Sequence, residues 1–219
     1  MPRLLFEKTG KAIWISHLDL MRVFQRAFKR AGLPLTHTQG YNPRPSVSIA
    51  LPLSVGVESC CELLDFDLDG ISVPPEELKQ RLNNALVEGV RVLDVYEQGR
   101  KLKHLAYLHC KVSLEYDKEI SQEGIEAIRG LFAGKELVVP KKGKNGIVDQ
   151  DIIPMIRSLE VTQEDAHTIS LNSVICCQNP TLNPGQLVSA IERYLPQWIP
   201  DFFRCYRMEL FDTEDAVFR

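Results

Sequence analysis

Residues 16 to 34 restrict the possible folds most strongly, because they carry the signals of one complete amphipathic helix with both ends marked. Ser16 and Asp19 have the spacing of a short capping box. Apolar residues then recur every three or four positions, the period of a helix that buries one side: Leu20, Phe24, Ala27 and Ala31. Gly32, followed by Pro34, predicts the end of the helix. Such a helix needs a second layer to cover its apolar side.

Strand-like segments surround this helix and supply that layer. Apolar or alternating stretches predict strands at residues 3–8, 35–38, 46–51, 61–68 and 90–96, and residues 12–15 are expected to extend or pair with the first of them. Pro74-Pro75, followed by Glu76 and Glu77, predicts the start of a second helix. The resulting order, β-α-β-β-α-β, is the ferredoxin-like pattern.

The same order follows a polar, basic linker at residues 99–103. Strands are predicted at residues 108–116, 136–140, 168–177 and 203–211, helices at 122–132 and 184–194, and a short extra helix at 149–158. No sequence repeat accompanies the repeated pattern. We therefore predict an α+β protein of two tandem ferredoxin-like (βαββαβ) halves, residues 1–99 and 100–219.

Composition excludes several classes of protein. The 219 residues contain no apolar run long enough for a membrane span and begin with a charged segment without a signal-peptide core, so we expect a cytoplasmic protein without membrane contacts. The six cysteines form two adjacent pairs and two singles, which is not the spacing of a zinc or iron–sulfur site. We expect buried thiols, with no metal and no cofactor in this chain. No sequence motif of a hydrolase, metalloprotease or nucleotide-binding loop is present, so no reaction is indicated.

Charge is segregated along the chain. Residues 1–46 hold eight lysines and arginines against two acidic residues, a net charge of +6, whereas residues 47–99 hold three against ten, a net charge of −7. Residues 100–146 and 147–219 carry net charges of +4 and −6. This segregation predicts a local anion site rather than a protein that coats nucleic acid, so we do not expect DNA binding.

The predicted helix supplies the first part of a candidate anion or RNA site. Arg22, Arg26 and Arg30 are four residues apart and share one side of a helix, with Lys29 beside them, and guanidinium groups bind phosphate in a bidentate manner. His17 lies at the helix start, where free N–H groups favour anions. The structural alternatives are a solvated face for the arginines and a capping role for His17, Ser16 and Asp19.

The second part is the loop at residues 38–45. Two prolines restrict its backbone, and Tyr41 could stack on a base while Asn42 and Arg44 contact a base edge and a phosphate. The structural alternative is a defined turn. Three carboxylates, Asp19, Glu58 and Glu62, are candidates for orienting the cations. The basic segment at residues 141–146 is expected to form a solvated hairpin tip that could also touch phosphate.

These residues also carry a family resemblance. The chain resembles the radical SAM-linked protein family in several stretches: Phe6-x-Lys8-x-Gly10, Ser16 through Arg22, Arg26-Ala27, Arg30 through Pro34, Gly40 through Pro45 without position 44, Leu51 through Leu53, and Val55 through Ser59 on to Glu62. The resemblance is strong over residues 1–70 and weaker beyond. It implies a companion of radical SAM enzymes with uncharacterised function, either fused to the enzyme or encoded separately, in an RNA-related setting. Because this chain has no radical SAM portion, the resemblance implies a radical SAM partner in trans.

Three functional hypotheses follow. The first is a non-catalytic binding module that presents RNA or another anionic substrate to a radical SAM enzyme. The second, by fold analogy, is a metal-independent RNA-processing enzyme in which His17 acts as general acid–base and the arginines stabilise the transition state. The third is a protein–protein adaptor, for which Arg22, Arg26 and Arg30 would each bond to a buried carboxylate.

Overall fold

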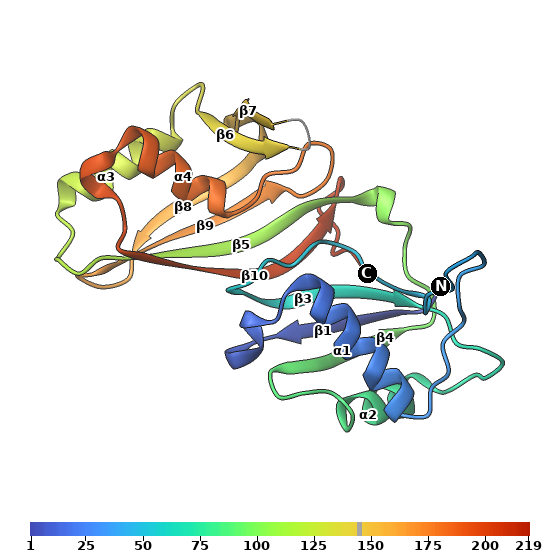
Figure 1. Cartoon of the computed structure of the whole chain (residues 1–219). Coiled ribbons are helices and arrows are strands. Elements are labelled where there is room, and N and C mark those ends of the chain that lie inside the picture. The colour runs from blue at the N-terminus through green and yellow to red at the C-terminus, as the bar shows by residue number, and fades with distance from the viewer. Residues whose placement is uncertain (144–145) are drawn as a thin grey trace. The chain divides into compact units, whose positions relative to one another are not determined.

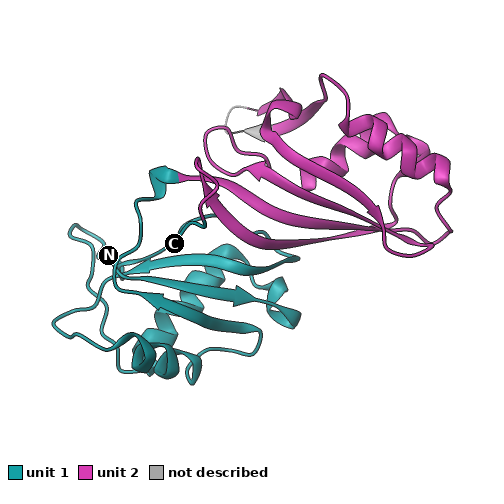
Figure 2. Cartoon of the chain, turned by 180° about the vertical axis from the view of Figure 1, so that it is seen from behind, with its two compact units in different colours: residues 1–104, 217–219 teal, residues 105–216 magenta. Residues whose placement is uncertain are grey.

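The computed structural model describes residues 1–143 and 146–219, apart from the side chains of residues 142 and 143. The chain divides into two compact units (Figure 2). Unit 1 contains residues 1–104 and the last three residues, 217–219, and unit 2 contains residues 105–216. The linker expected at residues 99–103 lies at the end of the first stretch of unit 1. The return of the C-terminus to unit 1 was not indicated by any sequence pattern.

Unit 1 has the element order β-α-β-β-α-β (Figure 1). Its elements are β1 (Arg3–Lys8), the short 3-10 helix η1 (Gly10–Trp14), α1 (His17–Arg30), β2 (Val47–Ile49), β3 (Val57–Phe66), α2 (Pro75–Asn83), β4 (Val90–Tyr96) and the 3-10 helix η2 (Leu102–His104). Strand β1 lies between β3 and β4, and β2 pairs with β3. All of these pairings are antiparallel.

Both helices of unit 1 cover the same face of its sheet. Leu4 and Phe6 of β1 and Leu64 of β3 pack in one core with the apolar sides of α1 and α2. The ring of Phe24 on α1 meets the ring of Phe6 edge-on, with centroids 4.7 Å apart. The predicted amphipathic period of residues 17–31 is therefore confirmed, and it fixes which side of α1 faces solvent.

The other face of the same sheet carries a buried ion pair. Arg3 is only 2% exposed, and its Nε and Nη2 donate to the two carboxylate oxygens of Asp65 at 2.6 and 2.9 Å. Its guanidinium also lies over the ring of Phe218, 5.3 Å from the centroid. The C-terminal residues thus help to bury this pair.

The described residues of unit 2 form ten elements. They are β5 (Leu105–Glu115), α3 (Gln122–Phe132), β6 (Val138–Gly143), β7 (Gly146–Asp151), the 3-10 helix η3 (Ile153–Met155), β8 (Ile156–Gln163), β9 (Thr168–Cys176), α4 (Gly185–Tyr194), the 3-10 helix η4 (Pro196–Trp198) and β10 (Phe202–Asp212). Its sheet has the order β10-β5-β9-β8 with antiparallel pairing throughout. Strands β6 and β7 form a separate antiparallel hairpin.

The middle of unit 2 differs from its prediction. The segment 136–140 was expected to join the main sheet but instead enters the separate hairpin, and the expected helix at 149–158 is replaced by β7, η3 and the start of β8. The strand next to β9 is β8. Because most of the side chains of β8 are polar and solvent-exposed, its sequence has no clear apolar alternation to indicate a strand. The expected tip at 141–146 includes residues 144 and 145, which lie outside the described residues.

Two further segments of unit 1 were predicted wrongly. Residues 12–15 were expected to be strand-like, but η1 covers residues 10–14. Residues 35–38 form two isolated backbone bridges, Leu35 with Leu68 and His37 with Pro45, rather than a strand. The prediction of a protein built from both helices and antiparallel strands is confirmed, with four α-helices among the described residues.

We expect the stability of unit 2 to fall between pH 10 and pH 12 because of Tyr116. Its hydroxyl donates to the carbonyl of Trp198 at 3.1 Å, and burial, with a smaller effect from the Asp201 carboxylate, raises the pKa of Tyr116 to about 12. In the unfolded chain a tyrosine titrates near pH 10. The contribution of the neutral Tyr116 side chain to stability is therefore fully present below about pH 10, and it is lost as the pH rises through the pKa of the folded state.

The measurement is denaturant unfolding of the wild type and of Tyr116→Phe from pH 9 to pH 12. The difference in unfolding free energy between the two proteins should shrink across this range. A difference that stays constant over the whole range would contradict the assignment.

Candidate anion-binding site

The N-terminus of α1 is organised by the predicted capping residues. Ser16 has extended backbone angles, and its hydroxyl oxygen accepts from the backbone N–H of Asp19 at 3.2 Å. The same hydroxyl donates to the Asp19 carboxylate at 2.7 Å. This bond to Ser16, followed by the bond from Arg22, lowers the pKa of Asp19. The predicted helix start is confirmed, and capping accounts for both Ser16 and Asp19.

The three predicted arginines have three different environments. Arg22 pairs with Asp19 at 2.6 Å, and both side chains are more than half exposed. Arg30 donates to the carbonyl of Ala85, in the turn that follows α2. Arg26 is exposed and, within the described part of the chain, takes part in no hydrogen bond or ion pair. Among the described residues none of the three is bonded to a buried carboxylate, the arrangement that would have favoured the adaptor hypothesis.

Helix geometry identifies the cations that share the solvent side of α1. At 100° per residue, Arg22, Arg26 and Lys29 lie within about 60° of one another and opposite Phe24. Lys29 is exposed and has no hydrogen bond or ion pair among the described residues. We define the cation face as Arg22, Arg26 and Lys29. Arg30 is left out because it is bonded to the turn that follows α2.

His17 lies on a different side of the helix. It is seven residues before Phe24, and that separation places it about 20° from Phe24 and away from the cation face. Its Nδ1 is buried and has no hydrogen-bond partner among residues 1–143 and 146–219. The helix therefore does not bring His17 and the exposed arginines together on one side.

The loop at residues 38–45 is closed at its base by two hydrogen bonds between Thr38 and Arg44. Thr38 donates its N–H to the carbonyl of Arg44 at 2.8 Å, and Arg44 donates its N–H to the Thr38 hydroxyl at 3.0 Å. The side chain of Tyr41 is 100% exposed, and Asn42 and Arg44 are exposed as well. A closed base with a fully exposed ring is an arrangement in which Tyr41 can stack on a base without rearrangement of the fold.

A cavity of about 520 Å³ adjoins the base of this loop. Gln25 and Lys29 of α1 and His37 at the loop base contribute polar groups to its lining. The rest of the lining is mostly apolar, with Asp69 as its acidic member. Sequence reasoning placed Lys29 beside the arginines without counting it among the site residues, and it did not select His37. The place of Lys29 on the helical wheel was enough to include it, whereas the position of His37 depends on how the loop folds back.

The predicted orienting carboxylates have partners of their own. Glu58 accepts from the backbone N–H of Gly10 at 3.3 Å. Glu62 is 2% exposed, and its carboxylate accepts from the Ser59 hydroxyl at 2.8 Å. Asp19 pairs with a predicted cation, Arg22. A role for Glu58 and Glu62 in orienting the arginines stays a prediction.

Lys8 is a buried cation that was not among the predicted site residues. Its Nζ donates to the carbonyl of Ile15 at 3.0 Å and to that of Ser54 at 3.4 Å. These bonds tie the end of β1 to the segments that enter α1 and β3. The apolar residues of β1 did not indicate that its last residue would be a buried lysine.

The cysteines, possible metal clusters and the lengths of the helices bear on the remaining predictions. All six cysteines are free thiols. Within the described residues, no three histidine, cysteine or acidic side chains gather in a way that could hold a metal ion. Among those same residues, no helix has the length and apolar character needed to cross a bilayer.

Residues 2–184 match the model of a protein family described as "Uncharacterized protein conserved in bacteria (DUF2344)". This match covers most of the chain, so the protein belongs to that family. No curated protein matches the sequence. Among solved structures, "Crystal Structure of an Unknown Protein from Galdieria sulphuraria" is similar over 94% of this chain and 96% of that chain, with 11% identity and a TM-score of 0.26. A likeness at that TM-score supports no inference about fold or function.

Proposed function

We propose that this protein is an accessory module that binds RNA or another anionic substrate and presents it to a radical SAM enzyme supplied in trans. The observation that carries the binding part is the exposed cation face of α1. Arg26 and Lys29 have no hydrogen bond or ion pair within the described residues, and Lys29 also lines the cavity below the Tyr41 loop. The partner part rests on the family resemblance of residues 1–70.

The chemistry of this surface suits a nucleic acid strand better than a simple anion. The cation face supplies guanidinium and ammonium groups for phosphate oxygens. The exposed Tyr41 ring supplies a stacking surface, and the cavity between α1 and the loop base supplies an apolar lining with the polar groups of Lys29 and His37. Phosphate, stacking and enclosed contacts on neighbouring elements are the combination found in single-strand RNA sites.

We also propose that each unit is a ferredoxin-like half. Unit 1 has the strand order β4-β1-β3-β2. Unit 2 has the corresponding order β10-β5-β9-β8, with the β6–β7 hairpin inserted between its first helix and its next sheet strand. The equivalent positions of helices and strands in the two units support this classification.

The enzyme hypothesis has less support than the binding hypothesis. It required His17 and the arginines to act on one phosphate, but α1 places His17 near the side of Phe24 and the cation face on the opposite side. A nucleophile, base and charge stabiliser must converge on one reacting atom to be effective. The separation around the helix therefore favours a binding role.

The test is binding of the full chain to a labelled pool of small RNA across a salt series. For Arg26→Ala/Lys29→Ala we expect roughly tenfold weaker binding and a salt slope smaller by about 1.4, because two phosphate contacts to a single strand are removed. The matched control is Arg91→Ala, which removes an exposed cation from β4 in the same unit. Undiminished binding of the double variant would reject the cation face as the RNA site.

The partner part needs a separate experiment. A purified radical SAM protein from the same organism is mixed with the full chain, and complex formation is followed by sedimentation velocity with and without bound RNA. We expect a complex that persists when the RNA-binding variant replaces the wild type. No association at any concentration tested would reject the companion role and would leave the RNA result unaffected.

A further inference from the structure

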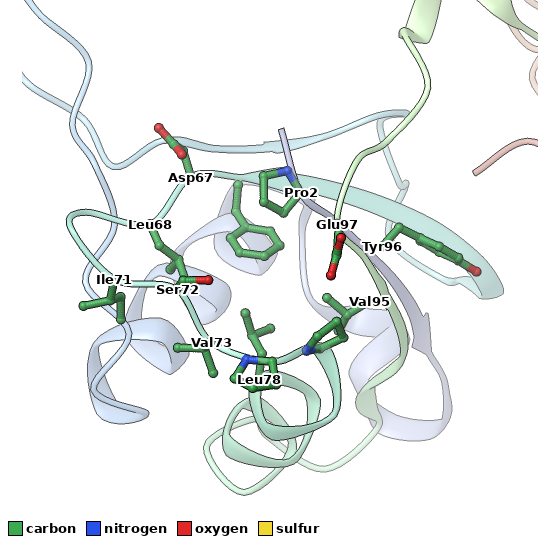
Figure 3. A pocket seen from close by; sticks show the side chains of 13 residues that line it. Pro2, Asp67, Leu68, Ile71, Ser72, Val73, Leu78, Val95, Tyr96 and Glu97 are labelled. Atoms are coloured by element: carbon green, nitrogen blue, oxygen red, sulfur yellow. The ribbon is translucent and has the colours of Figure 1, made fainter.

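Unit 1 contains a second and larger cavity, and none of the residues of the loop at 38–45 lines it. It has a volume of about 690 Å³ and is formed where β1 begins, where β3 and β4 end, and where α2 begins (Figure 3). This volume falls within the range of about 300 to 1,000 Å³ that small-molecule sites occupy. The proposed RNA site does not use any of its lining residues.

The lining is mostly apolar with a small number of polar groups. Phe66, Leu78 and Val95 bring apolar side chains from β3, α2 and β4. Figure 3 shows the Glu97 carboxylate and the Ser72 hydroxyl pointing toward the interior of the cavity. An apolar surface with a few inward polar groups is the usual composition of a ligand site.

The charge of the cavity is negative. Its lining contains Asp67 and Glu97 but no lysine, arginine or histidine. Asp67 has a partner, since its carboxylate accepts from the Thr36 hydroxyl at 3.0 Å, and Figure 3 shows it turned away from the interior. Glu97 has no hydrogen bond or ion pair among the residues that the structure describes. The inward carboxylate is therefore available to a ligand.

The nearby start of α2 does not make this an anion site. Helix N-termini attract anions through free backbone N–H groups. Here Pro74 is the N-cap and Pro75 the first helical residue, and a proline has no N–H to donate. Glu76 and Glu77 occupy the same first turn and complement its partial positive charge. The ligand that this lining complements is thus a cation with an apolar body.

We propose that this cavity binds a small organic cation, an amine carried on an apolar ring or chain. The ammonium group donates to the Glu97 carboxylate and to the Ser72 hydroxyl oxygen, and the apolar body packs against Phe66, Leu78 and Val95. This binding is independent of the proposed RNA function, because it involves different residues and the opposite charge.

The experiment uses the full chain labelled with ¹⁵N and three probe amines of different size: n-hexylamine, phenethylamine and tryptamine. Each is compared with the neutral alcohol of the same skeleton. We expect at least one amine to shift the amide signals of residues 72 and 95–97 and to bind about tenfold more tightly than its alcohol, the difference expected of a charge-assisted hydrogen bond.

Three variants test whether the amine binds in the cavity through the Glu97 carboxylate. Glu97→Gln should weaken the amine about tenfold and leave the alcohol unchanged, because only the charge-assisted contact is lost. Glu76→Gln, the matched control on the exposed first turn of α2, should leave both unchanged. Ser72→Phe should abolish binding of both by filling the cavity. The proposal is overturned if none of the three amines binds, or if amine and alcohol bind equally and Glu97→Gln has no effect.

Discussion

Asp65→Ala is expected to lower the free energy of unfolding by about 3 kcal/mol. The substitution leaves the Arg3 guanidinium charged and without its carboxylate, at a position that is 2% exposed. One guanidinium nitrogen, Nη1, already has no hydrogen-bond partner among the described residues, so no second acceptor is at hand to compensate. Removal of one member of a buried pair costs much more than the pair itself contributes, because the remaining charge is desolvated.

A double-mutant cycle separates the buried charge from the loss of a contact. The wild type, Asp65→Ala, Arg3→Met and the double variant are unfolded with urea. We expect the double variant to recover most of the stability that Asp65→Ala loses, since methionine fills the volume beside Phe218 without a charge. If the double variant is as unstable as the sum of both single variants, an unpaired buried charge is not the cause.

Asp65 also shows where sequence reasoning stops. The alternation in residues 61–68 correctly places Leu64 and Phe66 on the core side and Asp65 on the other. The pattern does not show that this other side is covered. Residues 217–219 return to unit 1 from more than 150 positions away and help to enclose the Arg3 pair. This burial arises from tertiary contacts, so the alternation of apolar residues along the strand does not indicate it.

The same difference between local and tertiary features explains which parts of the candidate site could be predicted from the sequence. The cap at Ser16, the apolar side of α1 and its end at Gly32 depend on neighbouring residues, and all were predictable. Gly32 has a φ of +66°, the left-handed conformation in which glycine commonly ends a helix. The pairing of Arg30 with Ala85 and the inclusion of His37 in a cavity depend on segments that meet only in the fold.

The edge strand β8 was not predicted from the sequence, for a related reason. A strand with both faces partly exposed has no need of apolar alternation, and its main support is the backbone pairing with β9. The segment before it contains Pro154 and a carboxylate, Asp151, that accepts from the N–H groups of Leu137 and Ile153. These features resemble a helix start in the sequence, and only a single 3-10 turn forms there.

Phe24→Ala is expected to destabilise the protein by about 3 to 5 kcal/mol. Phe24 is fully buried and its ring meets that of Phe6, so truncation removes apolar contact and leaves a cavity between α1 and the sheet. Urea unfolding measures the loss. Phe24→Leu is the graded control, with a smaller expected loss because most of the side-chain volume is kept.

The same variants test whether docking of α1 matters to the cation face, since Arg22, Arg26 and Lys29 lie on the side of the helix opposite Phe24. At a temperature where Phe24→Leu is fully folded, its RNA affinity should stay close to that of the wild type, because the exposed side chains are unchanged. A stability loss for Phe24→Ala below about 1.5 kcal/mol would mean that α1 is not held by this core contact. The orientation of its cations would then need another explanation.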